Sequence, residues 1–217
     1  MSTPNIRNVF VVSPGRTGTA AMSKALQHLE DFTCGHETAE GRLAQERFPY
    51  PSHHVEVDNR LTWMLGTLVK EHSPEETLIV IIKRDQGAVA RSYLQRFLVP
   101  DGIVASYSDG IIRHGGRTLD VAQDYVAAVY DQLDLLHTSG FEVAEFDHVD
   151  MGQAVQFIFE RLGDPGSVDA ALEILNSPVN SSRNSVVLDL ARHARLNSIA
   201  FARNSAAVVS QAKARRR

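Results

Sequence analysis

A short segment near the amino terminus, residues 13–19, combines the residue types that bind a phosphate or a sulfate. It reads SPGRTGT. Its two glycines let the backbone approach an anion closely, its threonines supply hydroxyl donors, and Arg16 supplies a fixed charge with several N–H donors. The sequence therefore predicts an anion-binding turn made by seven consecutive residues: Pro14, Gly15, Arg16, Thr17, Gly18, Thr19 and Ala20.

This turn is not a Walker A motif, because it does not read G-x-x-x-x-G-K-[ST]. It lies between the apolar run Val9–Val12 and an amphipathic segment that begins at about Ala20. A strand that turns into a helix leaves the first N–H groups of the helix without partners, and these groups attract anions. The alternative interpretation is a tight turn capped by a threonine, with Arg16 in solvent.

A second candidate anion site follows the apolar run Thr77–Lys83. Arg84 stands at the end of this run, and Ser92 comes eight residues later. If a helix begins near Gln86, the guanidinium and the hydroxyl converge where the strand ends, which suits a second phosphate. The alternative is that Arg84 pairs with a nearby carboxylate, Asp85 or Glu71, and that Ser92 bonds its own helix backbone.

Periodicity predicts the elements that position these residues. We expect strands at 9–12, 53–57, 77–83 and 141–146, and helices from about 20, around 61–68, from about 86 to 97, at 119–137 and at 151–162, with two more helices after them. Residues 31–52 show no clear period, and 100–116 is expected to be an irregular connection. Strands separated by helices predict a three-layer α/β/α fold with a central parallel sheet. In such sheets ligands bind outside the carboxyl ends of the strands.

Composition narrows the class of protein further. The 217 residues predict one domain, 1–217, with a basic tail from about residue 205. A formal net charge of −4 argues against general nucleic-acid binding. The single cysteine, Cys34, is typical of a reducing compartment. The sequence shows neither a signal peptide nor a run long enough for a membrane span, so we expect a cytoplasmic protein.

Together the two segments resemble the sulfotransferases that use 3′-phosphoadenosine 5′-phosphosulfate (PAPS). The family's first strand is followed by a loop of the type Pro-x-Lys/Arg-Ser-Gly-Thr-Thr, which holds the 5′-phosphosulfate. Its second motif, an arginine after an apolar strand with a serine eight residues later, holds the 3′-phosphate, and Arg84 and Ser92 match it. The residues that fall on the first loop are Pro14, Arg16, Thr17, Gly18 and Thr19.

Three positions depart from the family's pattern. Thr17 stands where serine is usual, Ala20 replaces the second threonine, and Gln86 replaces a common proline. The resemblance still implies a P-loop type fold, PAPS as the sulfuryl donor and Arg16 at the bridging oxygen of the reacting group. It extends more loosely to residues 140–165, which are similar to the family's strand, acidic turn and helix ending in Leu-Gly-x-Pro.

An attacking hydroxyl also needs a general base. In the carbohydrate branch of the family a glutamate precedes the helix that leads into the second motif, and Glu56 in HHVEVDNRLTW occupies that place. We expect desolvation to raise its pKa from ~4.3 towards working pH. Asp58, His54, and His36 with Glu37 are the reserve candidates. A solvated carboxylate on a short strand is the alternative interpretation of Glu56.

Two other segments contain residues that bear on the site. Residues 53–58 hold histidines and carboxylates, but no H-E-x-x-H or cysteine pair accompanies them, so we predict no metal. Near the carboxyl end, VNSSRNS supplies Arg183, which the resemblance places in a loop that closes over the cofactor. The alternative is a polar loop that caps the next helix at Ser185.

The sequence therefore predicts a sulfotransferase that moves a sulfuryl group from PAPS to a hydroxyl or amine of a carbohydrate or small metabolite, leaving adenosine 3′,5′-bisphosphate. Two alternatives use the same fold. One is a non-catalytic nucleotide-binding or interaction protein, which the Ala20 departure favours. The other is a P-loop kinase of small molecules, which the missing Walker A motif disfavours.

Overall fold

The structure is a computed structural model that describes residues 6–43, 46–94, 102–114 and 118–177. The chain divides into two compact units. The first comprises Met1–Leu94 and Thr118–Val179, and the second comprises Gln95–Arg117 and Asn180–Arg217. Both predicted anion-binding segments lie in the first unit. The predicted basic tail and Arg183 lie outside the described residues.

The first unit is built on a parallel sheet of five strands in the order β2-β3-β1-β4-β5. The strands are β1 (Asn8–Val12), β2 (Thr33–His36), β3 (His54–Val57), β4 (Thr77–Lys83) and β5 (Glu142–Asp147). Because neighbouring strands are parallel, their carboxyl ends share one edge of the sheet. The registers Val11 to Val57 and Val12 to Ile81 place the ends of β1, β3 and β4 side by side there.

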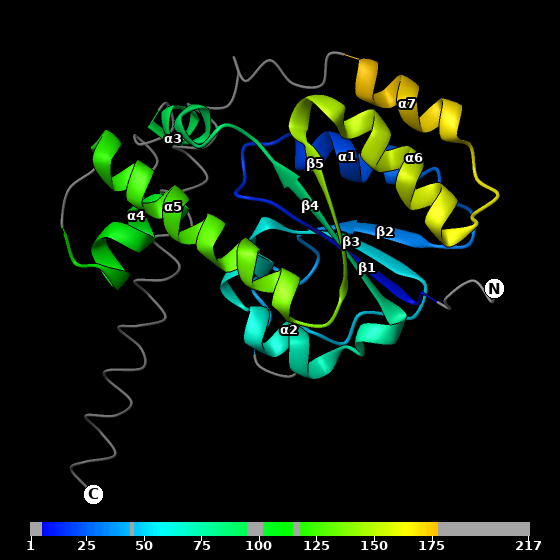
Figure 1. The fold of residues 1–217 in the computed structure, drawn as a ribbon, viewed down its shortest axis with the longest axis horizontal. Helices are drawn as coiled ribbons and strands as arrows, with labels where there is room; N and C mark the ends of the chain where they lie inside the picture. The colour runs from blue at the N-terminus through cyan, green and yellow to red at the C-terminus, as the bar shows by residue number, and fades with distance from the viewer. Residues whose placement is uncertain (1–5, 44–45, 95–101, 115–117, 178–217) are drawn as a thin grey trace, which may run out of the picture. The chain divides into compact units, whose positions relative to one another are not determined.

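Alternate residues of the strands face opposite sides of the sheet, and both sides are covered, so the central strands read as continuous apolar runs. The side formed by Val9, Val11 and Val80 packs against α1 (Thr19–Leu26), α6 (Met151–Leu162) and α7 (Val168–Asn176). In Figure 1 these three helices lie together on one side of the strands. The core on this side also includes Met22, Leu26, Val155, Ile158 and Ala171.

The opposite side of the sheet is covered by the 3₁₀ helix Asn59–Trp63, by α2 (Leu65–Glu71) and by α5 (Leu119–Leu135) (Figure 1). Phe10 points to this side and is fully buried. The helix α3 (Gln86–Leu94) packs against α5, and the Tyr93 and Tyr125 rings meet edge to face at 5.3 Å. The predicted three-layer α/β/α fold with a central parallel sheet is therefore confirmed.

Several elements differ from the sequence prediction. The strand β2 was not expected, because TCGH is short, is exposed at both ends and shows no apolar run. The predicted helix around 61–68 divides into the 3₁₀ helix and α2 at Met64. The second of the two late helices falls outside the described residues.

In the second unit the structure describes residues 102–114. The irregular connection expected there contains a short helix, α4 (Ile103–Ser106), which continues into a π-helical turn, Tyr107–Ile111. The expectation was wrong because Val104, Ala105 and Tyr107 bury one face, as helical residues do. Across the described parts of both units, every helix is too short or too polar to cross a bilayer.

Candidate functional site

The loop between β1 and α1 has a backbone shape that exposes N–H groups to a ligand. Gly15, Arg16 and Gly18 have φ angles of 78°, 60° and 90°, a left-handed conformation that is unusual for arginine. The Gly15 N–H donates to Ser13 Oγ at 3.1 Å, which fixes the start of the turn. Helix α1 begins at Thr19 without a side-chain cap. Its first N–H groups and the positive end of its dipole are therefore available to an anion.

Gly15 is required at its position by the side chain of Tyr93. A Cβ added to Gly15 would overlap the Tyr93 hydroxyl and stand 3.0 Å from Asn59 Nδ2. The same hydroxyl donates to the Pro14 carbonyl at 2.9 Å. Helix α3 therefore holds the loop through the Tyr93 hydroxyl. The sequence analysis assigned no role to Tyr93 or Asn59, because no spacing motif marks them.

The two predicted anion-binding segments are in direct contact. Arg16 Nε donates to Ser92 Oγ at 3.1 Å, across 76 positions of the chain. Arg84 Nη1 donates to the Arg16 carbonyl at 2.6 Å. The first segment follows β1 and the second follows β4, which are neighbours in the sheet. The arrangement brings two guanidinium groups and several hydroxyl and N–H donors to one edge.

Two polar atoms in these segments fit an anionic ligand. Thr17 Oγ1 and Arg84 Nε are both buried, and neither has a hydrogen-bond partner among the residues that the structure describes. A buried donor without a partner costs free energy of about 1–3 kcal/mol. Phosphate or sulfate oxygens would supply the missing acceptors, so these two donors fit an oxyanion.

The observed contacts of the second segment differ from the alternative interpretations given for Arg84 and Ser92. Asp85 Oδ1 accepts from the Ala88 N–H at 2.7 Å and so caps α3, and it lies 3.7 Å from Arg91 Nη2. Within the described ranges, no ion pair joins Arg84 to Asp85 or to Glu71. Ser92 uses its hydroxyl to accept from Arg16.

The backbone of Arg84 is held by Tyr130 of α5. The Arg84 N–H donates to Tyr130 Oη at 3.0 Å, and the Tyr130 hydroxyl donates back to the Arg84 carbonyl. Arg84 follows the last residue of β4, so a side chain replaces the strand partner that its backbone would otherwise need. The sequence prediction missed Tyr130, which appeared only as one residue of a long amphipathic helix.

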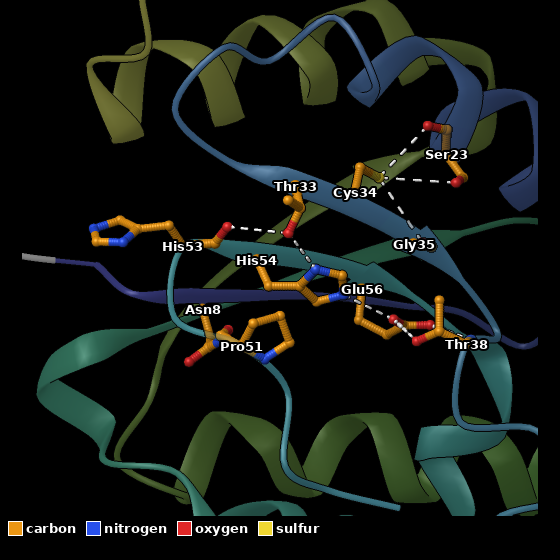
Figure 2. Close-up of polar contacts among 10 residues, drawn as sticks. All are labelled: Asn8, Ser23, Thr33, Cys34, Gly35, Thr38, Pro51, His53, His54 and Glu56. Carbon is orange, nitrogen blue, oxygen red and sulfur yellow. Dashed lines mark hydrogen bonds and ion pairs between the residues drawn. The ribbon is translucent and has the colours of Figure 1, made fainter.

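Glu56 lies in a buried polar network on β3, and its side chain is fully buried (Figure 2). Its Oε1 accepts from the Thr38 N–H at 2.9 Å, and its Oε2 accepts from Thr38 Oγ1 at 2.5 Å and lies 3.0 Å from His54 Nε2. His54 Nδ1 in turn lies 2.8 Å from Thr33 Oγ1. Both carboxylate oxygens are therefore engaged within the protein.

The expected rise in the pKa of Glu56 is wrong. Burial alone would raise this pKa, but the hydrogen bonds from His54 and Thr38 stabilise the carboxylate and together lower the pKa below its ordinary value. The sequence showed the glutamate but not its partners, because Thr38 lies in the segment without a clear period. Its geometry is that of a carboxylate that anchors the turn after β2.

The pKa of Asp58, a reserve candidate, is shifted in the direction opposite to that of Glu56. Asp58 follows β3 at the carboxyl edge, and its N–H donates to the Val11 carbonyl at 3.1 Å. Burial raises the pKa of Asp58 to about 6, against the opposing effect of the Arg60 backbone N–H, which donates to Oδ1 at 2.7 Å. The described residues offer no hydrogen bond to Oδ2. A carboxylate with this pKa changes its charge close to neutral pH.

The remaining reserve candidates lie in two places. His36, at the end of β2, is exposed and its Nε2 lies 3.4 Å from Thr19 Oγ1 of the loop. Glu37 forms an ion pair with Arg60. His54 belongs to the Glu56 network. In the part of the chain that the structure describes, no three His, Cys, Asp or Glu side chains are grouped so that they could share a metal ion.

Comparisons with known proteins give a similarity to solved structures alone. No protein-family model matches this sequence, and no curated protein matches it. Among solved structures, the chain is similar to mouse sulfotransferase SULT7A1 complexed with PAP, with 14% sequence identity and a TM-score of 0.48. The match covers 79% of this chain and 64% of that one. A likeness at this level does not assign a function.

Proposed function

We propose that this protein is a PAPS-dependent sulfotransferase that acts on a hydroxyl or an amine of a carbohydrate or small metabolite. The observation that carries the proposal is the contact between the two anion-binding segments, in which Arg16 bonds Ser92 and Arg84 bonds the Arg16 carbonyl. A donor nucleotide with phosphates at both its 5′ and 3′ positions matches two such segments at one sheet edge.

Each segment is assigned one end of the nucleotide. The loop residues Pro14–Ala20, with the start of α1, would hold the 5′-phosphosulfate, and the buried Thr17 hydroxyl would donate to it. Arg84 and Ser92 would hold the 3′-phosphate, with Arg84 Nε as the donor that has no partner among the described residues. When bound, PAPS supplies an activated sulfuryl group and adenosine 3′,5′-bisphosphate as the leaving group.

The protein's part in the reaction is then positioning and electrostatics. Arg16 has its guanidinium held by Ser92 and its carbonyl held by Arg84, so its charge would be preorganised to stabilise the negative charge that the leaving group gains. Removing one such preorganised donor typically costs about 10²–10³ in rate.

Asp58 is the general base that the geometry favours. It stands at the sheet edge beside the end of β1, and its pKa of about 6 suits acceptance of a proton near neutral pH. Glu56 is instead engaged with Thr38 and His54, and its lowered pKa makes it a weaker base. His36 is a second candidate because it lies against Thr19 of the loop.

The proposal is tested first by nucleotide preference. Calorimetry should show that adenosine 3′,5′-bisphosphate binds more tightly than ATP with Mg²⁺, and a preference for ATP would contradict the proposal in favour of a kinase. A screen of sugars and small alcohols and amines with sulfur-labelled PAPS then identifies the acceptor. Tight bisphosphate binding without transfer to any acceptor would support the non-catalytic alternative.

A further inference from the structure

A cavity of about 800 Å³ lies on the first unit, at the end of the strands opposite to the Arg16–Ser92 contact. Asn8, which begins β1, and Thr77, which begins β4, both line it. The five residues of β1 rise about 3.3 Å each, so roughly 15 Å separates the cavity from the anion-binding loop. Its volume is in the range of small-molecule sites.

The floor of the cavity is aromatic and well packed. Phe10 is fully buried beneath it, and the Phe10 ring meets the Tyr50 ring edge to face at 5.3 Å and the His72 ring at 4.6 Å. The Tyr50 ring also stacks on His54, with an angle of 13° between the planes. Phe48, two residues before Tyr50 and also in the lining, is buried as well. A flat apolar group would find matching rings here.

The segment 48–51, which contains Tyr50 and forms one wall of the cavity, is held by hydrogen bonds from two elements. Asn8 Nδ2 donates to the Pro51 carbonyl at 2.9 Å, and both residues are labelled in Figure 2. The ring of His72, the residue that follows α2, hydrogen-bonds the Phe48 backbone. These contacts fix residues 48–51 to both β1 and α2, so the cavity exists before a ligand enters, which lowers the entropy cost of binding.

Three arginines and two glutamates, Glu71 and Glu76, line the cavity, which leaves a small excess of positive charge. Arg42 and Arg47 line it, and within the described ranges neither guanidinium forms an ion pair with a carboxylate. Arg7 is also in the lining, but Glu76 neutralises it at 3.2 Å. Burial and the negative charges of Glu56 and Asp58 raise the pKa of Tyr50. The positive charges of Arg47 and Arg42 oppose this rise, so both guanidiniums lie close enough to act on the ring. The Arg47 guanidinium is placed by Met64, whose Sδ accepts from Nη1 at 2.6 Å.

We propose that this cavity is a second ligand site, which binds a small organic anion with a flat apolar body, such as an aromatic sulfonate, sulfate ester or carboxylate. The ring lies on Tyr50 and Phe48, and the anionic group lies between Arg42 and Arg47. Arginine suits this role because its planar fork binds oxyanions through two hydrogen bonds. The site is separate from the proposed nucleotide site, and its occupancy does not depend on sulfuryl transfer.

Naphthalene-2-sulfonate is the probe, and its uncharged relative naphthalene-2-sulfonamide is the comparison ligand. In calorimetry or ligand-observed NMR, the sulfonate should bind wild-type protein, and the sulfonamide should bind about tenfold or more weakly, as expected for loss of charge-assisted hydrogen bonds. Arg42→Ala and Arg47→Ala should each weaken sulfonate binding about tenfold. Tyr50→Phe, which keeps the ring, should bind the probe nearly as the wild type does.

The matched control is Lys24→Ala, which removes one positive charge from an exposed position of α1 and should leave probe affinity unchanged. Saturation with adenosine 3′,5′-bisphosphate should also leave the affinity for naphthalene-2-sulfonate unchanged, because the two sites are a strand length apart. Circular dichroism checks that each variant is folded. Equal binding of sulfonate and sulfonamide, unchanged binding in both arginine variants, or displacement of the probe by the bisphosphate would overturn the proposal.

Discussion

Glu56 and Asp58 are two residues apart at the end of β3, yet the environment shifts the pKa values of their carboxyl groups in opposite directions. Glu56 receives hydrogen bonds from Thr38 and His54 and has a lowered pKa, whereas Asp58 is desolvated with fewer donors and has a pKa of about 6. Two carboxylates whose environments separate their pKa values often have separate roles. Here the first anchors a turn, and the second is the proposed base.

Asp58→Asn should abolish or strongly reduce sulfuryl transfer while bisphosphate affinity is retained, because the amide keeps the bond from the Arg60 N–H but cannot take a proton. The measurements are transfer of labelled sulfate and calorimetric titration with the bisphosphate. His36→Gln is the companion variant. If it loses transfer and Asp58→Asn does not, the base is His36.

The pH dependence follows from the same group. Since a base must be ionised to accept a proton, kcat should rise with pH through about 6 and level off above 7, in accordance with the pKa of Asp58. A rate that stays flat between pH 5 and 7, with the protein folded throughout, would rule out Asp58. The profile is measured at saturating donor concentration so that changes in binding do not contribute.

The two carboxylates should also have opposite effects on stability at pH 7.5. The folded-state pKa of Asp58 lies above its ordinary 3.8, so the folded protein loses stability as pH rises from about 4 through 6, and Asp58→Asn should raise the free energy of unfolding by about 1–3 kcal/mol. The pKa of Glu56 lies below 4.5, so its contribution is present above that pH and lost as pH falls through the folded pKa. Glu56→Gln should therefore lower the free energy of unfolding by about 1–3 kcal/mol.

Urea denaturation at pH 7.5 measures both changes. Thr38→Val is the control for the Glu56 network, because it removes the hydroxyl that donates to Oε2 but retains the backbone donor. Thr38→Val should lower the free energy of unfolding by less than Glu56→Gln does. A Glu56→Gln variant as stable as the wild type would show that the network does not stabilise the fold.

Arg84→Ala should weaken binding of adenosine 3′,5′-bisphosphate by about 10–100-fold, the effect of losing charge-assisted hydrogen bonds. Affinity for 5′-AMP, which lacks the 3′-phosphate, should change much less. Arg91→Ala removes an exposed arginine from the same region and serves as the control. Equal losses for the two nucleotides would contradict the assignment of Arg84 to the 3′-phosphate.

Gly15→Ala should destabilise the loop and weaken bisphosphate binding, because the new Cβ overlaps the Tyr93 hydroxyl and the φ of 78° is strained for alanine. Tyr93→Phe removes the overlapping oxygen. Combining the two substitutions should recover part of the lost affinity in a double-mutant cycle. Strict additivity would show that the two residues do not interact.

The parts of this protein that sequence alone predicted are those with strong local patterns. TLIVIIK gave a strand with the observed bounds Thr77–Lys83, and the amphipathic segment 151–162 gave α6. The spacing of Arg84 and Ser92 placed both beside the first loop, since strands that end at one sheet edge bring their following residues together. Their roles in binding a nucleotide stay predictions.

What the sequence did not show depends on contacts between distant elements. The pKa of Glu56 is set by Thr38, which lies in a segment without periodicity, and the edge strand β2 that leads to it has no apolar run. Tyr93 and Tyr130 lay within the predicted helices without an assigned role, yet their hydroxyls bond the backbone of Pro14 and Arg84. Local patterns carry no information about such pairings.

Because the hydroxyl of Tyr130 occupies both the N–H and the carbonyl of Arg84, strand β4 and helix α5 are mechanically linked where the guanidinium emerges. A small rotation or translation of α5 would displace the Arg84 backbone and so change the direction of the Arg84 side chain. Under the proposed function, contact between Arg84 and the 3′-phosphate would therefore depend on the position of α5, a helix that need not touch the ligand.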